Sequence, residues 1–152
     1  MRTRFLLATT LIFLVCETLT AQSPADSVEA EKRAFLEAIG KQIAGNESKP
    51  AAEVFKNIKM MKDATAGRLL SVMNFGYSRS LGVSCTYCHV AGEWAKDDKP
   101  AKQIAREMSA MVAKINGDHL TGISNLRSSK PVVNCTTCHR GQTQPALSLP
   151  PR

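Results

Sequence analysis

Apolar residues recur at helical spacing in four stretches of the chain, and polar or glycine-containing breaks separate these stretches. The spacing predicts helices over about residues 26–40, 50–61, 65–78 and 100–115. Pro50 and Pro100 stand at the starts of two of these stretches, where the first turn of a helix favours proline. Gly82 is expected to end the third helix, and Asn116-Gly117 the fourth. Because no stretch alternates apolar and polar residues convincingly with the period of a strand, the pattern predicts an all-α fold.

The first 21 residues match a secretory signal sequence. Arg2 and Arg4 precede an apolar run of eleven residues, and Ala21 supplies a small residue at the expected cleavage point. Cys16 lies within this segment, so the mature chain is expected to keep four of the five cysteines. This interpretation predicts export to the periplasm. The alternative is that the segment is not cleaved and tethers the chain to the membrane.

These patterns divide the chain into four parts. Residues 1–21 form the signal sequence, and residues 22–49 form an N-terminal helix and linker. Residues 50–142 form the domain that carries the candidate chemistry, and residues 143–152 form a proline-rich tail that is expected to be extended. The formal net charge of +7 favours acidic protein partners or anionic membrane surfaces over nucleic acid, because an exported domain does not meet chromosomal DNA. An ordinary solvated surface explains the charge equally well.

Two pentapeptides match the attachment signature of c-type haem. One spans residues 85–89 (Cys-Thr-Tyr-Cys-His) and the other spans residues 135–139 (Cys-Thr-Thr-Cys-His). Two thiols three residues apart lie on one helical turn and can bond the two vinyl groups at one edge of a porphyrin, while the next imidazole reaches the iron. The sequence therefore predicts two covalently bound haem c groups in two helix–loop–motif units in tandem. The predicted thioether residues are Cys85, Cys88, Cys135 and Cys138, and the predicted iron ligands are His89 and His139.

Other uses of paired cysteines fit the sequence less well. A zinc site is disfavoured because 46 residues separate Cys88 from Cys135, whereas zinc ribbons place about 15–20 residues between their pairs. A redox dithiol is expected in a βαβ setting, which the pattern lacks. Structural disulfides suit an exported chain, but they give no reason for His89 and His139.

The sixth iron ligand separates an electron carrier from a catalyst. His119 is the one histidine outside the motifs, so at most one iron could have two histidine ligands from this chain. Methionine is the alternative, and a histidine–methionine pair raises the reduction potential. Met73 lies on the helix before the first motif, and Met108 and Met111 share a face of the helix before the second. Because methionine also fills ordinary cores, the pattern alone leaves these assignments open.

Three stretches of the chain resemble the cytochrome c subunit of photosynthetic reaction centres. The first runs from Val72-Met73 through Leu81-Gly82-Val83-Ser84 to the first motif, the second is residues 105–111 (Ala-Arg-Glu-Met-Ser-Ala-Met), and the third is residues 133–141 around the second motif. In this family a helix upstream of each motif supplies an axial methionine. The resemblance therefore implies Met73 as the second ligand of the haem on His89. For the haem on His139 it implies Met108, not Met111. The best-known members carry four haems, whereas this chain has two motifs.

The motifs and the resemblance predict a periplasmic dihaem cytochrome that passes single electrons between redox proteins and is not an enzyme. A membrane-bound electron-transfer complex is one such partner. The alternative is a dihaem peroxidase-like enzyme, which needs an open iron coordination position and a polar distal group. No distal acid or base stands out in the sequence.

Overall fold

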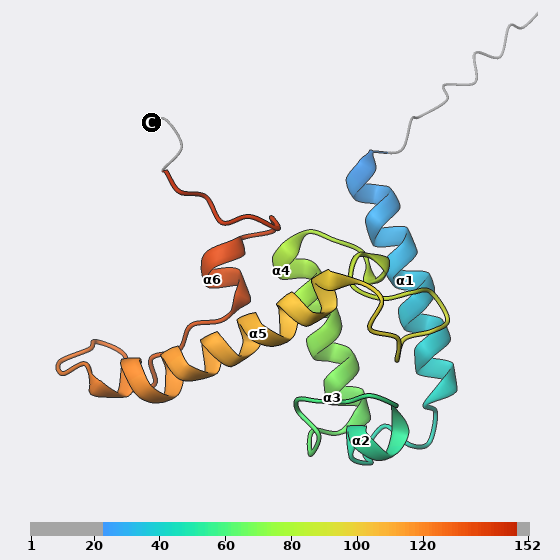
Figure 1. Cartoon of the computed structure of the whole chain (residues 1–152), viewed down its shortest axis with the longest axis horizontal. Coiled ribbons are helices and arrows are strands. Elements are labelled where there is room, and N and C mark those ends of the chain that lie inside the picture. Colours follow the sequence, from blue (N-terminus) through green and yellow to red (C-terminus); the bar gives the residue numbers. More distant parts are fainter. Residues whose placement is uncertain (1–22, 149–152) are drawn as a thin grey trace, which may run out of the picture.

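The computed structural model describes residues 23–148, and this part of the chain is helical and contains no strand (Figure 1). Its α-helices are α1 (Pro24–Gln42), α2 (Ala51–Val54), α3 (Ala66–Ser71), α4 (Arg79–Leu81), α5 (Pro100–Lys114) and α6 (Cys135–His139). Two π-helical segments span Val72–Ser78 and Ile115–His119, and two 3₁₀ turns span Cys85–Tyr87 and Leu120–Gly122. The predicted all-α fold is confirmed. The predicted signal sequence lies outside the described residues.

Helix α1 begins with a capping box. Ser23 Oγ accepts the backbone N–H of Asp26 at 3.2 Å, and the Asp26 carboxylate accepts the backbone N–H of Ser23. Pro24 follows in the first turn, where its missing N–H costs nothing. Helix α1 has 19 residues, but between residues 23 and 148 no helix is long and apolar enough to cross a membrane.

The second predicted helix is wrong in its extent. Helix α2 has four residues and ends at Val54, because Phe55 adopts extended backbone angles. Beyond it, Asn57 and Met61 have positive φ angles of 61° and 52°, which no helix accommodates. Residues 55–61 therefore form a loop, and Ile58 faces a pocket from that loop.

The third predicted helix is confirmed, with a π-helical segment in its middle. Helix α3, the segment Val72–Ser78 and helix α4 follow one another without a break. The Thr65 hydroxyl caps the start by accepting the Arg68 N–H at 3.2 Å, and Gly82 ends the run with a φ of 68°. A π-helical segment within an α-helix is rare and is frequent at functional sites.

The fourth helix begins at Pro100 as predicted, but it does not stop at Asn116-Gly117. Helix α5 continues through the π-helical segment Ile115–His119 and a 3₁₀ turn to Gly122. The Asn116 side chain is used elsewhere: its amide donates to the Val133 carbonyl at 2.9 Å, and its oxygen accepts the Val133 N–H at 2.8 Å. Asn116 therefore ties the connection before the second motif to the end of the long helix.

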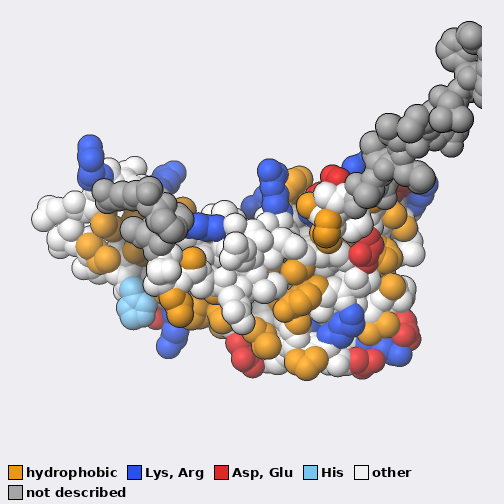
Figure 2. Space-filling model, turned by 90° about the horizontal axis from the view of Figure 1, so that it is seen from above, with side chains coloured by type: hydrophobic (Ala, Val, Ile, Leu, Met, Phe, Trp, Pro, Cys, Tyr) orange, Lys and Arg blue, Asp and Glu red, His pale blue; other side chains and the backbone are white. Residues whose placement is uncertain are grey.

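The described part of the chain buries few apolar side chains. Its buried apolar residues are Ile43, Ala51, Ala66 and Leu69. Large apolar side chains are exposed instead, and Figure 2 shows hydrophobic side chains across one face of the molecule. A domain of this size normally buries a contiguous apolar core, so the protein chain alone supplies less core than its fold requires.

Candidate haem-binding sites

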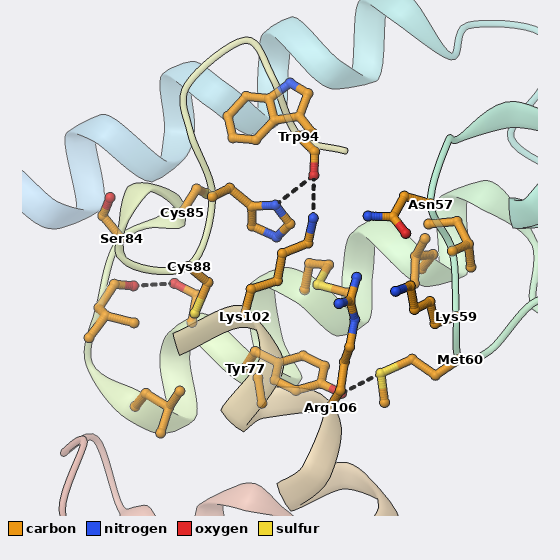
Figure 3. Close-up of a pocket in the computed structure, with 18 of the residues that line it drawn as sticks. Asn57, Lys59, Met60, Tyr77, Ser84, Cys85, Cys88, Trp94, Lys102 and Arg106 are labelled. Atoms are coloured by element: carbon orange, nitrogen blue, oxygen red, sulfur yellow. Dashed lines mark hydrogen bonds between the residues drawn. The ribbon is translucent and has the colours of Figure 1, made fainter. Parts of the chain in front are cut away.

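The structure brings the four predicted residues of the first site into one pocket. Met73 lines this pocket from the π-helical segment, and Cys85, Cys88 and His89 line it from the first motif. About 840 Å³ of empty space lies within this pocket, part of it open to solvent. Figure 3 shows Cys85 and Cys88 beside it.

A second hollow adjoins the first and extends the apolar wall. Met73, Cys85 and His89 line both hollows, so these residues stand where the two meet. Helix α1 contributes Leu36 and Ile39 to the second hollow. Together the two hollows form one largely apolar space beside the first motif.

Helix α1 is held against the first motif by two kinds of contact. The ring of Phe35 packs edge-on against the ring of Trp94, with 5.1 Å between centroids. The Thr86 hydroxyl, inside the motif, donates to a Glu31 carboxylate oxygen at 2.6 Å. This bond, together with one from Ser84, keeps the pKa of Glu31 below its usual value. The N-terminal helix therefore forms part of the wall of the first site.

The His89 imidazole is oriented for a metal ion. Its Nδ1 lies 3.0 Å from the Trp94 carbonyl oxygen, and because a carbonyl only accepts, Nδ1 carries the proton and Nε2 keeps its lone pair. Burial lowers the pKa of His89, which favours the neutral ring that iron binds. Burial also raises the pKa of the Cys85 and Cys88 thiols.

A charged cluster lies at the rim of the first pocket. Asp97 accepts hydrogen bonds from Arg106 at 2.9 Å and Asn57 at 2.9 Å, and it pairs with Lys102 at 3.0 Å. These bonds, that of Arg106 most of all, hold the pKa of Asp97 far below its usual value, so the carboxylate stays ionised. Lys102 and Arg106 both line the pocket and give it positive charge.

The first pocket also has lining residues that were not expected from the sequence, and three of them stand out. Met60 reaches it from the loop that replaces the predicted helix, and its sulfur accepts the Tyr77 hydroxyl at 3.6 Å. Trp94 and Lys102 come from the loop after the motif and from α5. Trp94 is the one tryptophan of the chain and lies five residues after His89, a signal that sequence reasoning could have used.

The histidine of the second motif is oriented in the same way as the histidine of the first, by a bond to a backbone carbonyl. His139 Nδ1 lies 3.0 Å from the Gln142 carbonyl oxygen, which fixes the same tautomer. Asn134 begins α6 with a capping box that includes Thr137. Cys138 is exposed and Cys135 is half-buried. The second attachment segment is therefore ordered in the same way but is more open.

Met73 and His89 line one pocket, whereas Met108 lies on an exposed helix face. Met108 is 43% exposed and Met111 is 48% exposed. With Ile104, which is 53% exposed, they form an apolar stripe along one face of α5. His119 ends the π-helical segment that follows this helix.

The two attachment segments are joined directly. The hydroxyls of Ser80 on α4 and Thr136 on α6 lie 2.6 Å apart, and the Gly141 N–H donates to the Ser80 carbonyl at 2.8 Å. Gly82 approaches the Gly141 carbonyl so closely that a Cβ would not fit. Within residues 23–148, no three histidine, cysteine or acidic side chains gather as a group that could hold a metal ion.

Comparison with known proteins shows which family this chain resembles. The photosynthetic reaction centre cytochrome C subunit profile matches residues 17–148. A reaction center cytochrome c subunit from Thermochromatium tepidum is 35% identical over 98 residues, 62% of this chain and 22% of that protein. Cytochrome c-554 from Chloroflexus aurantiacus is 30% identical over 55% of this chain and 20% of its own length.

A reaction center cytochrome c subunit from Roseobacter denitrificans is 30% identical over 102 residues, which are 63% of this chain and 26% of that protein. The chain thus matches about a quarter or less of the length of these relatives. The profile, by contrast, covers most of this chain and includes both motifs. The chain therefore belongs to the photosynthetic reaction centre cytochrome c subunit family.

Proposed function

We propose that this protein is a periplasmic dihaem c-type cytochrome that carries single electrons between redox partners. The observation that carries the proposal is the first pocket, where Met73, Cys85, Cys88 and His89 line one apolar space. Family membership supports haem c as the cofactor and electron transfer as the activity. A bound haem supplies a one-electron couple at its iron, and the protein tunes that couple through ligands and burial.

The first haem is assigned to Cys85 and Cys88 as thioether residues, with His89 and Met73 as axial ligands. The fixed Nδ1 proton of His89 supports this assignment, because it leaves Nε2 free to bind iron. Six ligands that stay bound suit a carrier, since nothing has to enter or leave during transfer. Met73 lines the same pocket from the π-helical segment, which supports it as the second axial ligand.

The second haem is assigned to Cys135 and Cys138, with His139 and Met108 as axial ligands. The apolar stripe of Ile104, Met108 and Met111 supports a flat apolar group on this face of α5. A haem there would cover side chains that are otherwise about half exposed. The choice of Met108 over Met111 rests on the family pattern alone.

The proposed partners are redox proteins at the outer face of the cytoplasmic membrane. Two of the relatives are named as subunits of photosynthetic reaction centers, which supports a membrane-bound electron-transfer complex as one partner. The basic charge of the chain supports an acidic docking surface on that partner.

Visible spectroscopy of the exported protein tests this function. Pyridine haemochrome quantification should give two haems per chain, and the oxidised protein should show the weak far-red band of methionine–iron bonding. Met73→Leu should remove the part of this band that the first haem contributes. Met60→Leu changes another methionine of the same pocket and should leave the band unchanged. Carbon monoxide should change the reduced spectrum little. Rapid binding of carbon monoxide to the wild type would instead support the peroxidase-like enzyme.

A further inference from the structure

Lys102 is a buried lysine beside the first pocket. It is 9% exposed, and its ammonium lies 2.9 Å from the Trp94 carbonyl, 2.6 Å from the Lys96 carbonyl and 3.0 Å from Asp97 Oδ1. An ammonium has three N–H donors, so all three are used. Burying a charge is costly unless it is paired and hydrogen-bonded, and here the loop from residue 94 to 97 closes around it.

The Trp94 carbonyl oxygen is shared between this lysine and the first iron ligand. His89 Nδ1 donates to it at 3.0 Å, and Lys102 donates to it at 2.9 Å. Figure 3 shows the two dashed lines meeting at this oxygen. A backbone carbonyl has two lone pairs, so it accepts both bonds at once. A buried positive charge is thus connected to the proposed iron ligand through one oxygen atom.

We propose that Lys102 is a positioning residue that raises the reduction potential of the first haem by acting on His89 through the Trp94 carbonyl. The proposal rests on the haem assignment made above. Reduction would add one electron to the iron, and no bond would form or break.

Two physical effects act in the same direction. The oxidised iron carries one more positive charge than the reduced iron, so a nearby ammonium destabilises the oxidised form. The ammonium also draws electron density from the Trp94 oxygen, which then accepts the His89 proton less strongly. The imidazole consequently donates less charge to iron, and this again disfavours the oxidised form.

Asp97 does not cancel this charge. Its carboxylate also pairs with Lys59 and Arg106, so the cluster of three cations and one anion keeps a net positive charge. Arg106 contacts Asp97 and not the Trp94 carbonyl, whereas Lys102 contacts both. Lys102 is therefore the member of the cluster that reaches the histidine.

The test is a spectroelectrochemical titration of the dihaem protein and its variants. Lys102→Met removes both the charge and the hydrogen-bond donor. At a fixed ambient potential, the ratio of oxidised to reduced first haem should rise on the order of tenfold, which corresponds to a reduction potential lower by about 59 mV. Lys102→Gln keeps a donor without the charge and should show an intermediate shift, and Lys102→Arg should restore most of the potential. The second haem should stay unchanged in all three.

The matched control is Lys96→Met. The Lys96 side chain is half exposed and pairs with Glu93 at 2.7 Å, so its loss removes a charge from the same loop without touching the Trp94 oxygen. A second readout is the proton resonance of His89 Nδ1–H in the reduced protein. It should move downfield in Lys102→Met, because the Trp94 oxygen then accepts this proton more strongly.

Three results would overturn the proposal. These are an unchanged first potential in Lys102→Met and Lys102→Gln, an equal shift of both haems, and a shift of the same size in Lys96→Met. Haem quantification separates these from failure of the proposed function, because wild-type protein without two haems would refute the function before any lysine variant is compared. If Lys102→Met does not fold, the comparison of Lys102→Gln with Lys102→Arg decides.

Discussion

The hydroxyls of Ser80 and Thr136 lie 2.6 Å apart although 56 positions separate the two residues in the sequence. Ser80 is on α4, which leads into the first motif, and Thr136 is between the two cysteines of the second. Ser80 is 2% exposed and Thr136 is exposed, so the bond joins a buried hydroxyl to one at the surface. The separation of the two attachment segments is therefore set by direct contact between them.

Gly82→Ala should be among the most destabilising single changes in the chain. Gly82 has a φ of 68°, and an added Cβ would collide with the Gly141 carbonyl. We expect a loss of about 2–4 kcal/mol in the free energy of unfolding, measured by denaturant titration. Gly92→Ala is the control, because Gly92 has a φ of 75° with nothing within 4 Å of an added Cβ. Equal losses in the two variants would show that the close approach to Gly141 is unimportant.

Ser80→Ala and Thr136→Ala should be coupled. Either change leaves a hydroxyl without its partner, so each should lower the free energy of unfolding by about 1 kcal/mol. The double variant should lose less than the sum of the two, because the second change removes a group that is already unpaired. A double-mutant cycle measures this difference. Strict additivity would contradict a direct bond between the segments.

Asp97 should make stability depend on pH in acid. Its folded pKa is held below the ordinary value of about 3.9 by Arg106, Asn57 and Lys102. A depressed folded pKa contributes stability above the unfolded pKa, and this contribution is lost as the pH falls below about 4. Urea unfolding midpoints between pH 6 and pH 3 should therefore fall more steeply for the wild type than for Asp97→Asn. Parallel pH profiles would show that this cluster does not contribute.

Removal of the haem attachment sites should remove most of the tertiary structure. The buried apolar residues of the described chain are only Ile43, Ala51, Ala66 and Leu69, so the haems are expected to supply the rest of the core. A variant with alanine at all four motif cysteines should show no cooperative thermal unfolding by near-ultraviolet circular dichroism. The variant with alanine at Cys135 and Cys138 alone should keep the packing around the first pocket. Cooperative unfolding of the fully substituted chain would contradict this.

Local signals in the sequence predicted most helix ends correctly. Thr65 and Gly82 bound the third helix through capping and a left-handed turn, and Pro100 begins the fourth. The prediction failed over residues 50–61, where apolar residues at helical spacing face a pocket from a loop. It also failed at Asn116, whose amide pairs with backbone 17 positions away. Helical periodicity reports which residues face apolar surroundings, but it does not say whether a helix or a loop presents them.

The residues of the candidate site that belong to short sequence motifs could be predicted from the sequence. Cys85, Cys88 and His89 follow from the first motif, and the resemblance adds Met73, which the structure places in the same pocket. Lys102 could not be found in this way, because its proposed role depends on a carbonyl eight positions earlier in a folded loop. Main-chain atoms carry no residue-specific signal, so a site that uses them becomes visible only in three dimensions.

The contact between α4 and α6 also bears on the role of the chain that connects the two motifs. Residues 121–130 are all exposed, and they lie in the connection between the long helix and the second motif. Because Ser80 and Thr136 fix where the second motif sits, the length of this connection does not set the distance between the haem attachment points. A change in the length of this exposed connection would therefore leave the spacing of the two motifs unchanged.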